Sequence, residues 1–360
     1  MSSAMVKLGD VINVHYGKAL KADQRVSNGS VHVFGSSGIV GNHDKTLCSY
    51  PTIIIGRKGS VGAITWAPDG GWIIDTAYYV EIKDNNKLDL RYLFYILSGI
   101  DLTKKTITTS IPGLNRDDLY DTFIKLPPFE EQKRIVDLLD KAEGIRQKRE
   151  QAIKLADDFL RATFATMYGN PITNPQKWPV HLMGEIIEFK GGNQPPKSDF
   201  IFEPKQGYIR LVQIRDFKSD KYATYIPQEK AKRIFEVDDV MIARYGPPVF
   251  QILRGLSGSY NVALMKASPK ENIRKGFIFY LLQLPEYHDV VVKNSERTAG
   301  QTGVNLELLN KFNVPLPPIY YQDEILARLA RIEKFKEKIE ISLNNLEMQF
   351  LSLQKRLMGF

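Results

Sequence analysis

The chain has 360 residues, of which 43% are hydrophobic and 25% charged, a balance typical of soluble globular proteins and a length sufficient for two domains. Lysine and arginine outnumber aspartate and glutamate by 49 to 41, and the resulting charge of +8 favours a polyanionic partner. Cys48 is the only cysteine, which excludes an internal disulfide and a cysteine-rich zinc site and fits a reducing compartment. Because there is no signal-peptide pattern and no run approaching about 18 apolar residues, we expect neither secretion nor a membrane span.

The first part of the chain is typical of short strands. Clusters of β-branched and aromatic residues lie between glycine, proline and Asp-Gly turns. These clusters predict strands at residues 31–34, 51–55, 62–66, 72–81 and 123–126. Helices predicted at residues 90–98 and 116–121 interrupt the strands, so the predicted class is mixed α and β.

A Leu-Pro-Pro step ending at Pro128 closes this globular part. Tandem prolines favour an extended segment from which a new helix can start. Residues 130–168 contain no proline and predict a long helix, which Gly169, Asn170 and Pro171 end.

The same features return in the same order in the second half of the chain. Residues 108–135 align without a gap on residues 298–325. Identical residues include Gly113, Asn115, Leu119, Leu126, Pro127, Pro128, Gln132 and Ile135, which fall on Gly303, Asn305, Leu309, Leu316, Pro317, Pro318, Gln322 and Ile325. Weaker similarity joins 7–17 to 181–192, 53–59 to 240–246 and 92–97 to 277–282. The sequence therefore predicts two copies of one fold that differ in loop length.

A second proline-free stretch, residues 320–358, predicts a second long helix, in which apolar residues recur at alternating spacings of four and three. That spacing indicates a coiled-coil seam, and the first helix carries it more weakly in the same phase. We predict the seam at Ile135, Leu139, Ile153, Leu160, Ile325, Leu329, Ile332, Ile339, Leu343, Leu346, Phe350 and Leu353. Arg146 and Lys336 place a basic residue at the same step of the seam. The repeated phase favours pairing of the two helices, and the alternative is that each helix packs on its own globular part.

The tandem arrangement resembles the specificity subunit of type I restriction-modification systems. The resemblance rests on a Gly-hydrophobic-Asn motif, a Leu-Pro-Pro step with a glutamine four residues beyond its second proline, and a heptad helix, each present twice. It covers nearly the whole chain. It implies an α+β fold of two tandem target-recognition domains with mixed strands and short helices, each followed by a long helix, with the two helices paired as an antiparallel coiled coil. The expected segments are residues 1–128, 129–170, 171–318 and 319–360.

The resemblance also implies the function. Each target-recognition domain would read one half of an asymmetric bipartite site in double-stranded DNA, and the helices would join two modification (methyltransferase) subunits that methylate adenine. Restriction subunits with translocase and nuclease activity would join this core. S-adenosylmethionine, ATP and magnesium would bind those partners, so for this cytoplasmic chain we expect no cofactor, no metal and no catalytic residue. The two copies share little outside the segments above, which predicts two different half-sites.

The length of the helices supports a divided target. A helix of about 38 residues spans ~57 Å at ~1.5 Å per residue. Along duplex DNA, at ~3.4 Å per base pair, this corresponds to about 17 base pairs. We therefore expect a nonspecific gap between the two half-sites.

Base-edge readout needs Arg, Lys, Asn or Gln on loops or helix starts, and phosphate contacts need cations. Both copies offer a turn after an apolar strand and an approach to a short helix, and residues 208–217 add a polar strand face or edge in the second copy. The candidate DNA-contacting residues are Arg57, Lys58, Lys104, Lys105, Thr109, Ser110, Asn115, Arg116, Arg210, Gln213, Arg215, Arg244, Tyr245, Lys293, Arg297, Gln301, Thr302 and Asn305. The alternatives are solvated turns for the cations and helix capping for the two asparagines, and we favour capping for the latter.

Two rival functions are a stand-alone bipartite DNA-binding regulator and a cryptic metal-dependent nuclease. Asp75 with Glu81 and Lys83 imitates the spacing of a nuclease core, and residues 203–205 do so more faintly, but the second copy keeps no acid at the corresponding strand. The sequence has no motif for amino methylation, no glycine-rich S-adenosylmethionine loop and no phosphate loop, and its five histidines lack metal-ligand spacing. We expect the chemistry to come from partner subunits.

Overall fold

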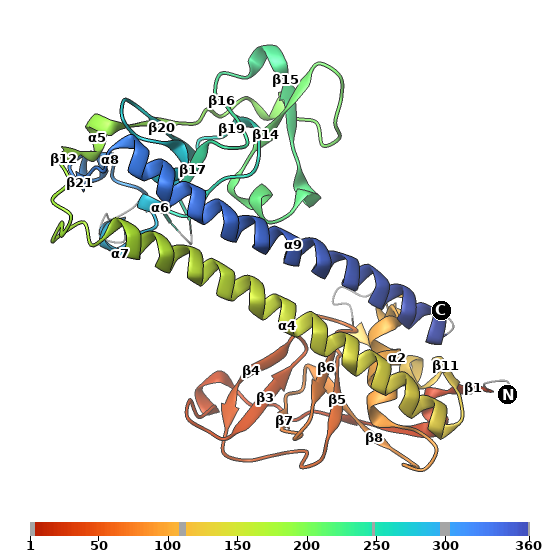
Figure 1. Cartoon of the computed structure of the whole chain (residues 1–360). Helices are drawn as coiled ribbons and strands as arrows, with labels where there is room; N and C mark the ends of the chain where they lie inside the picture. The colour runs from red at the N-terminus through yellow and green to blue at the C-terminus, as the bar shows by residue number, and fades with distance from the viewer. Residues whose placement is uncertain (1–3, 108–112, 247–248, 296–302, 359–360) are drawn as a thin grey trace. The chain divides into compact units, whose positions relative to one another are not determined.

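The computed structural model describes residues 4–107, 113–246, 249–295 and 303–358, and it divides the chain into two compact units (Figure 1). The first unit comprises Met1–Glu150 and Glu340–Phe360, and the second comprises Gln151–Ile339. Each unit contains one globular head and part of each long helix, so each long helix is shared between the units. The first head is residues 4–126 and the second is residues 180–315.

The first head is built on a four-stranded antiparallel sheet of order β2-β8-β5-β6. A separate three-stranded sheet has the order β4-β3-β7. The antiparallel pair β1-β11 joins the first and last strands of the head. The helices are α1 (Leu8–Val11), α2 (Leu90–Gly99) and α3 (Arg116–Tyr120). The strands are β1 (Ala4–Lys7), β2 (Ile12–Tyr16), β3 (Val31–Gly35), β4 (Gly38–His43), β5 (Thr52–Gly56), β6 (Ile64–Ala67), β7 (Trp72–Ile73), β8 (Ala77–Ile82), β9 (Thr106–Ile107), β10 (Gly113–Leu114) and β11 (Phe123–Leu126).

The prediction of one strand over residues 72–81 is wrong, because two strands occupy it. β7 pairs in parallel with β3, whereas β8 pairs with β2 and β5 in the other sheet. The chain therefore changes sheets at a turn in which the Ala77 N–H donates to Ile74 O at 3.1 Å. The strands β1, β2, β4, β9 and β10 were not predicted, and β4 contains two glycines that weaken the strand pattern.

The second head repeats this plan. Its sheet β13-β20-β17-β18 has the order of β2-β8-β5-β6, and β12-β21 corresponds to β1-β11. A further sheet has the order β15-β14-β19-β16. The helices are α5 (Met183–Ile186), α6 (Lys275–Leu281), α7 (Pro285–Ser295) and α8 (Leu306–Asn310). The strands are β12 (Val180–Leu182), β13 (Ile187–Gly191), β14 (Tyr208–Val212), β15 (Tyr225–Pro227), β16 (Ile234–Phe235), β17 (Val240–Ala243), β18 (Ile252–Leu253), β19 (Gly258–Tyr260), β20 (Leu264–Pro269) and β21 (Asn313–Pro315).

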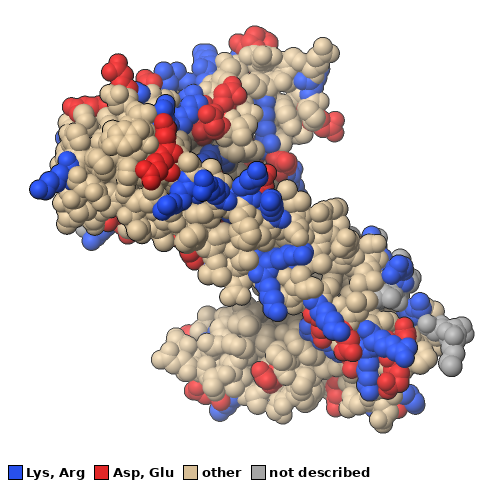
Figure 2. All heavy atoms as spheres, in the orientation of Figure 1, with Lys and Arg blue, Asp and Glu red and all other residues tan. Residues whose placement is uncertain are grey.

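The two long helices are α4 (Phe129–Tyr168) and α9 (Ile319–Met358), at the positions that the sequence predicts. They run antiparallel. In the second unit, Lys336 Nζ lies 2.6 Å from Asp157 Oδ1, and the Tyr321 hydroxyl donates to Met167 O at 3.0 Å. In the first unit, Arg149 Nη1 donates to Ser342 O at 2.9 Å. In Figure 2, lysine and arginine side chains are scattered along the band that the long helices occupy in Figure 1, on the face turned toward the viewer.

Along these helices, burial follows the heptad phase. All twelve residues of the predicted seam are buried or half-buried, and several of them also pack on the core of a head. Ile135 and Leu139 belong to the core of the first head, and Ile325 and Leu329 to that of the second. A carboxylate neutralises each basic residue of the seam, since Lys336 pairs with Asp157 and Arg146 pairs with Glu143.

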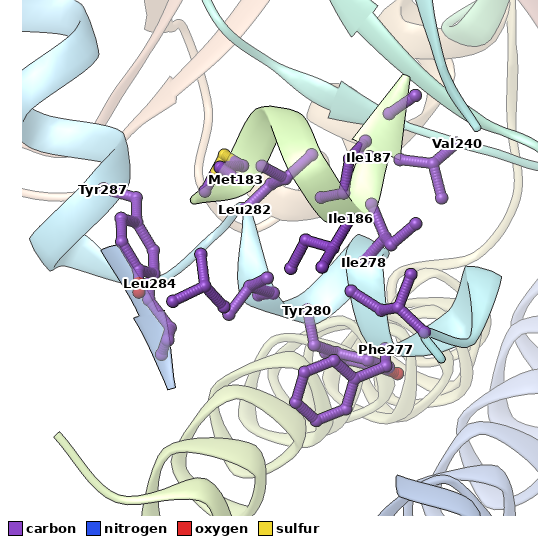
Figure 3. Packing of buried hydrophobic residues seen from close by; sticks show 14 of the residues in the cluster. Met183, Ile186, Ile187, Val240, Phe277, Ile278, Tyr280, Leu282, Leu284 and Tyr287 are labelled. Carbon is purple, nitrogen blue, oxygen red and sulfur yellow. The ribbon is translucent and has the colours of Figure 1, made fainter. Parts of the chain in front are cut away.

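Helix α4 also supplies aromatic residues to the core of the second head. Its Phe164 and Tyr168 rings lie 5.2 and 5.5 Å from the ring of Phe277 on α6. Figure 3 shows Ile278 between Phe277 and Val240 of β17 within the same buried cluster. In the second unit, the start of α9, the second head and the end of α4 therefore share one apolar core.

A buried glutamine joins each head to the start of its long helix. The Gln132 amide oxygen accepts from the Asp89 N–H at 2.8 Å, and its nitrogen donates to Lys87 O and Pro127 O at 2.8 and 2.9 Å. In the second head, the Gln322 oxygen accepts from the Arg274 N–H at 2.9 Å. The Gln322 nitrogen donates to the carbonyls of Asn272 and Pro317 at 2.9 and 2.8 Å. Both side chains are fully buried and fully hydrogen-bonded, which explains why glutamine recurs at this step.

Candidate functional site

In the first head, the two loops singled out from the sequence lie side by side. Lys58, in the turn after β5, forms an antiparallel bridge with Gly113 of β10. The Leu114 N–H donates to Arg57 O at 3.0 Å. The turn after an apolar strand and the approach to α3 therefore form one surface, with Arg57 half-buried and Lys58 exposed.

The second head makes the same contact with different side chains. Tyr245, after β17, forms an antiparallel bridge with Gly303, and the Val304 N–H donates to Arg244 O at 3.1 Å. Arg244 lies over the ring of Tyr245, with 5.0 Å between the guanidinium carbon and the ring centroid. The two heads therefore share this pair of loops and the arginine in it, and they differ in the next residue, Lys58 or Tyr245.

The asparagines of the shared motif cap helices, as predicted. The Asn115 side-chain oxygen accepts from the Asp117 N–H at 3.2 Å at the start of α3. Asn305 accepts from the N–H groups of Glu307 and Leu308 at 3.0 and 3.2 Å at the start of α8. An unpaired first-turn N–H is costly, so capping accounts for asparagine in both copies. DNA contact by either residue stays a prediction.

Aromatic rings hold the side chain of Arg57. Its guanidinium lies over Tyr16 and Tyr78, 5.1 and 5.7 Å from the ring centroids, and Nη1 donates to Asp75 O at 3.2 Å. Burial raises the pKa of Tyr78 to about 12, so its hydroxyl is a neutral donor at neutral pH and donates to Leu114 O at 3.0 Å. Tyr78 thus connects both loops of the site. Sequence reasoning missed Tyr16, whose only signal is its place at a strand end before Gly17.

Only the first half of residues 208–217 forms the strand that the sequence predicts. β14 ends at Val212 and lies between β15 and β19, so it is not an edge. Arg210 is ion-paired with Asp220 at 2.7 Å, and its side chain is only 18% exposed. Gln213 lies before a 3-10 turn, Ile214–Phe217, because the buried Asp216 carboxylate accepts from the Gln213 N–H at 2.8 Å and ends the strand. Arg215 is the one exposed residue of the three, and it lies over Tyr222, 5.5 Å from the ring centroid, with Nη2 donating to Tyr222 O at 3.4 Å.

The other candidates divide into two groups. Lys104 and Lys105 lie in a 3-10 turn, Leu102–Lys105, Arg116 begins α3, and Lys293 is exposed on α7. Five candidates lie outside the described residues: Thr109, Ser110, Arg297, Gln301 and Thr302.

The residues that imitate a nuclease core have other partners. Glu81 pairs with His15, with 2.8 Å between Oε2 and Nε2, and Lys83 Nζ donates to Gly9 O at 2.6 Å. Among the described residues, no group of three or more His, Cys, Asp and Glu side chains is placed to hold a metal ion. Within the same residues, no helix has the length and apolar character needed to cross a membrane.

Comparison with known proteins defines the class. Residues 2–155 and 175–347 each match the family model of the type I restriction modification DNA specificity domain. Because these matches cover most of the chain, the chain belongs to this family, and the protein is a DNA sequence-recognition subunit of a type I restriction-modification system. Specificity subunits are non-catalytic components of these systems, where they act with DNA and with other subunits.

Individual relatives are distant. The type I restriction enzyme EcoBI specificity subunit of Escherichia coli is 23% identical over 336 residues, which cover 82% of this chain and 70% of that protein. The MjaVIII specificity subunit of Methanocaldococcus jannaschii is 21% identical over 305 residues, covering 73% of this chain and 69% of that protein. The crystal structure of a type I restriction-modification S subunit from M. genitalium is 16% identical, with a TM-score of 0.59 over 99% of this chain and 96% of that chain. A structure from a study of type I system assembly is 18% identical, with a TM-score of 0.57 over 99% and 98% of the two chains. These structures show that the fold is shared.

Proposed function

We propose that each head of this subunit reads one half of an asymmetric bipartite DNA site. The supporting observation is that the same two loops meet in both heads, through Lys58 and Gly113 in one and Tyr245 and Gly303 in the other. The residue after the shared arginine differs between the heads, Lys58 in the first and Tyr245 in the second, and two different half-sites require such a difference. Arg57 and Arg244 are the base-reading candidates, because arginine pairs bidentately with guanine.

The long helices are proposed to hold two methyltransferase subunits. Exposed apolar side chains lie on both helices outside the seam, and water-exposed apolar groups of this size mark partner surfaces. In α4 they are Leu138, Ile145, Leu155 and Phe159, and in α9 they are Phe335, Ile341, Met348 and Leu351. In the second unit, a groove of about 560 Å³ between the helices is lined by Phe159, Ala162, Thr166, Arg328 and Arg331, among others. Its apolar floor and basic border fit an amphipathic acidic segment.

Restriction subunits would join this core, and S-adenosylmethionine, ATP and magnesium would bind the partner subunits in the cytoplasm. A stand-alone regulator is the rival proposal. It predicts tight, specific DNA binding by the isolated chain, whereas a specificity subunit should need its methyltransferase partner for full affinity.

Domain exchange tests the reading of half-sites. Residues 7–126 are replaced by the corresponding residues of another family member, and the complete system is placed in a host that lacks it. Methylome sequencing should show that one half of the methylated motif changes while the other half and the gap are kept. A change in both halves, or in neither, would contradict separate reading by the two heads.

A further inference from the structure

In the first head, one tyrosine ring gathers two arginines from distant parts of the chain. The guanidinium carbons of Arg57 and Arg116 lie 5.1 and 5.4 Å from the centroid of the Tyr16 ring. At such distances a cation is attracted to the aromatic ring. Tyr78 packs against the same ring in an edge-on arrangement, with 5.0 Å between centroids. Tyr16, the last residue of β2, therefore connects the β5 turn to the start of α3.

Among the described residues, Arg57 and Arg116 form no ion pair with a carboxylate, and Arg57 Nη1 instead donates to the Asp75 carbonyl oxygen at 3.2 Å. Tyr16 itself is 47% exposed. Two guanidinium groups held on one half-exposed ring repel each other, and this repulsion is relieved when an electron-rich ligand binds them.

The second head has no tyrosine with two stacked arginines at the corresponding position. Gly191 occupies the position of Tyr16, and the glycine that follows is kept, as Gly17 and Gly192. A Cβ at Gly17 would lie 2.1 Å from Ile74 O, and one at Gly192 would lie 1.9 Å from Asn261 O, so both heads need glycine at the same tight crossing. A Cβ at Gly191 would lie 3.1 Å from Arg244 Nη1. Arg244 therefore occupies the space into which a side chain at residue 191 would extend.

The position of Arg116 is also different in the second head. Leu306, the first residue of α8, stands there. The first head thus presents two arginines on a shared ring, whereas the second presents Arg244 beside Tyr245. The loop contacts are the same in both heads. The heads differ in the number of guanidinium groups that they present at this point of the surface.

We infer that Tyr16 is a specificity-determining positioning residue of the first head, which holds Arg57 and Arg116 so that they read a guanine edge in one half-site. The inference rests on the proposed function and adds the residue that sets the direction of the arginines. Arginine reads guanine through a bidentate contact, and a stacked guanidinium loses less side-chain freedom when it binds. In this role the ring is required and the hydroxyl is not.

The test compares Tyr16→Ala with Tyr16→Phe in the complete system, again by methylome sequencing. Tyr16→Phe should keep the wild-type motif. Tyr16→Ala should relax one or two positions in the half read by the first head, with about a 10- to 100-fold loss of preference there and no change in the other half. Tyr50→Ala, an exposed tyrosine of the same head, is the matched control and should leave the motif unchanged.

Three outcomes would overturn the inference. The first is an unchanged motif in Tyr16→Ala when Arg57→Ala alters the motif, which would leave the proposed function intact. The second is an unchanged motif in both Arg57→Ala and Arg116→Ala, which would also remove these loops from DNA reading. The third outcome applies if Tyr16→Ala abolishes methylation. The purified complex is then titrated with duplexes that differ from the site at single base pairs, and an equal loss of binding affinity on all of these duplexes would overturn the inference.

Discussion

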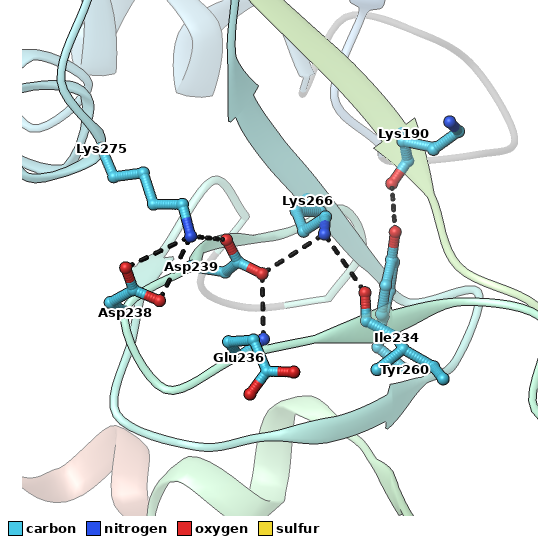
Figure 4. Close-up of polar contacts among 8 residues, drawn as sticks. All are labelled: Lys190, Ile234, Glu236, Asp238, Asp239, Tyr260, Lys266 and Lys275. Atoms are coloured by element: carbon cyan, nitrogen blue, oxygen red, sulfur yellow. Dashed lines mark hydrogen bonds and ion pairs between the residues drawn. The ribbon is translucent and has the colours of Figure 1, made fainter. Parts of the chain in front are cut away.

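At the scale of single residues, Asp239 is a buried carboxylate that two lysines contact, immediately before β17 in the second head (Figure 4). One carboxylate oxygen lies 2.7 Å from Lys275 Nζ, and the other accepts from the Glu236 N–H at 2.9 Å and from Lys266 Nζ at 3.3 Å. Burial alone raises the pKa of this carboxyl group, but the hydrogen bonds from Lys275, Glu236 and Lys266 outweigh it and lower the pKa below its usual value. The charged form is therefore stabilised by the folded state.

We predict that Asp239→Asn lowers the free energy of unfolding by about 1–3 kcal/mol at pH 7. A carboxyl group with a lowered folded-state pKa stabilises the fold above its unfolded pKa of about 4, and this stability is lost as the pH falls through the folded pKa. The difference between wild type and variant, measured by thermal unfolding, should shrink below about pH 4. Asp238→Asn is the control, since the Asp238 side chain is 71% exposed and its ion pair with Lys275 should contribute less than about 1 kcal/mol. Equal effects of the two substitutions, or a difference independent of pH, would contradict this account.

At the scale of secondary-structure elements, each long helix is joined to its head by one buried amide. Gln132 satisfies the N–H of Asp89, the residue that caps α2, together with two carbonyl oxygens. Each of these groups would be buried without a partner if the amide were lost, and such groups are costly. The amide therefore fixes where α4 begins relative to α2.

Gln132→Leu should destabilise the first unit by about 2–4 kcal/mol, because leucine keeps the bulk of the side chain and removes its three hydrogen bonds. Tryptophan fluorescence during denaturant unfolding measures this effect, since Trp66 and Trp72 lie in the first head and only Trp178 lies elsewhere. Gln151→Leu, an exposed position on the same helix, should change stability by less than about 0.5 kcal/mol. The explanation fails if the two substitutions have the same cost.

At the scale of the whole molecule, the two units each combine one head with a segment of both long helices. A head therefore shares its core with α4 and α9, as Phe277 does with Phe164. Because no unit is complete without both helices, we expect the chain to need its C-terminal helix for the stability of the first head. The exposed apolar residues of the helices are the surface proposed above for partner subunits.

Phe159→Glu should prevent assembly with a methyltransferase partner without unfolding the chain. Phe159 is exposed and lines the apolar groove, so a charge placed there would be buried on binding. After co-expression with the cognate methyltransferase subunit, gel filtration should show at least about a 10-fold loss of the complex. Ile172→Glu, another exposed apolar position outside the groove, should leave assembly intact. Unchanged assembly of both variants would place the docking surface elsewhere.

The sequence by itself determined the duplication, the two long helices and the capping asparagines. These features depend on local rules: proline and glycine mark where helices start and stop, a heptad phase marks a buried stripe, and asparagine caps the turn that follows it. Each rule acts over a few residues, so it can be read along the chain. The recurrence of Gln132 as Gln322 was visible as well, although its three bonds were not.

Only the tertiary structure decided which distant segments meet. It divided residues 72–81 between two sheets, placed β14 inside a sheet and ended it at Val212, before the turn that the buried Asp216 stabilises. It also brought Tyr16 against Arg57 and Arg116. Such contacts depend on strand order and register, which are set by the packing of the whole head and leave no periodic trace in the sequence. An isolated tyrosine at a strand end carries no local signal of the two arginines that fold onto it.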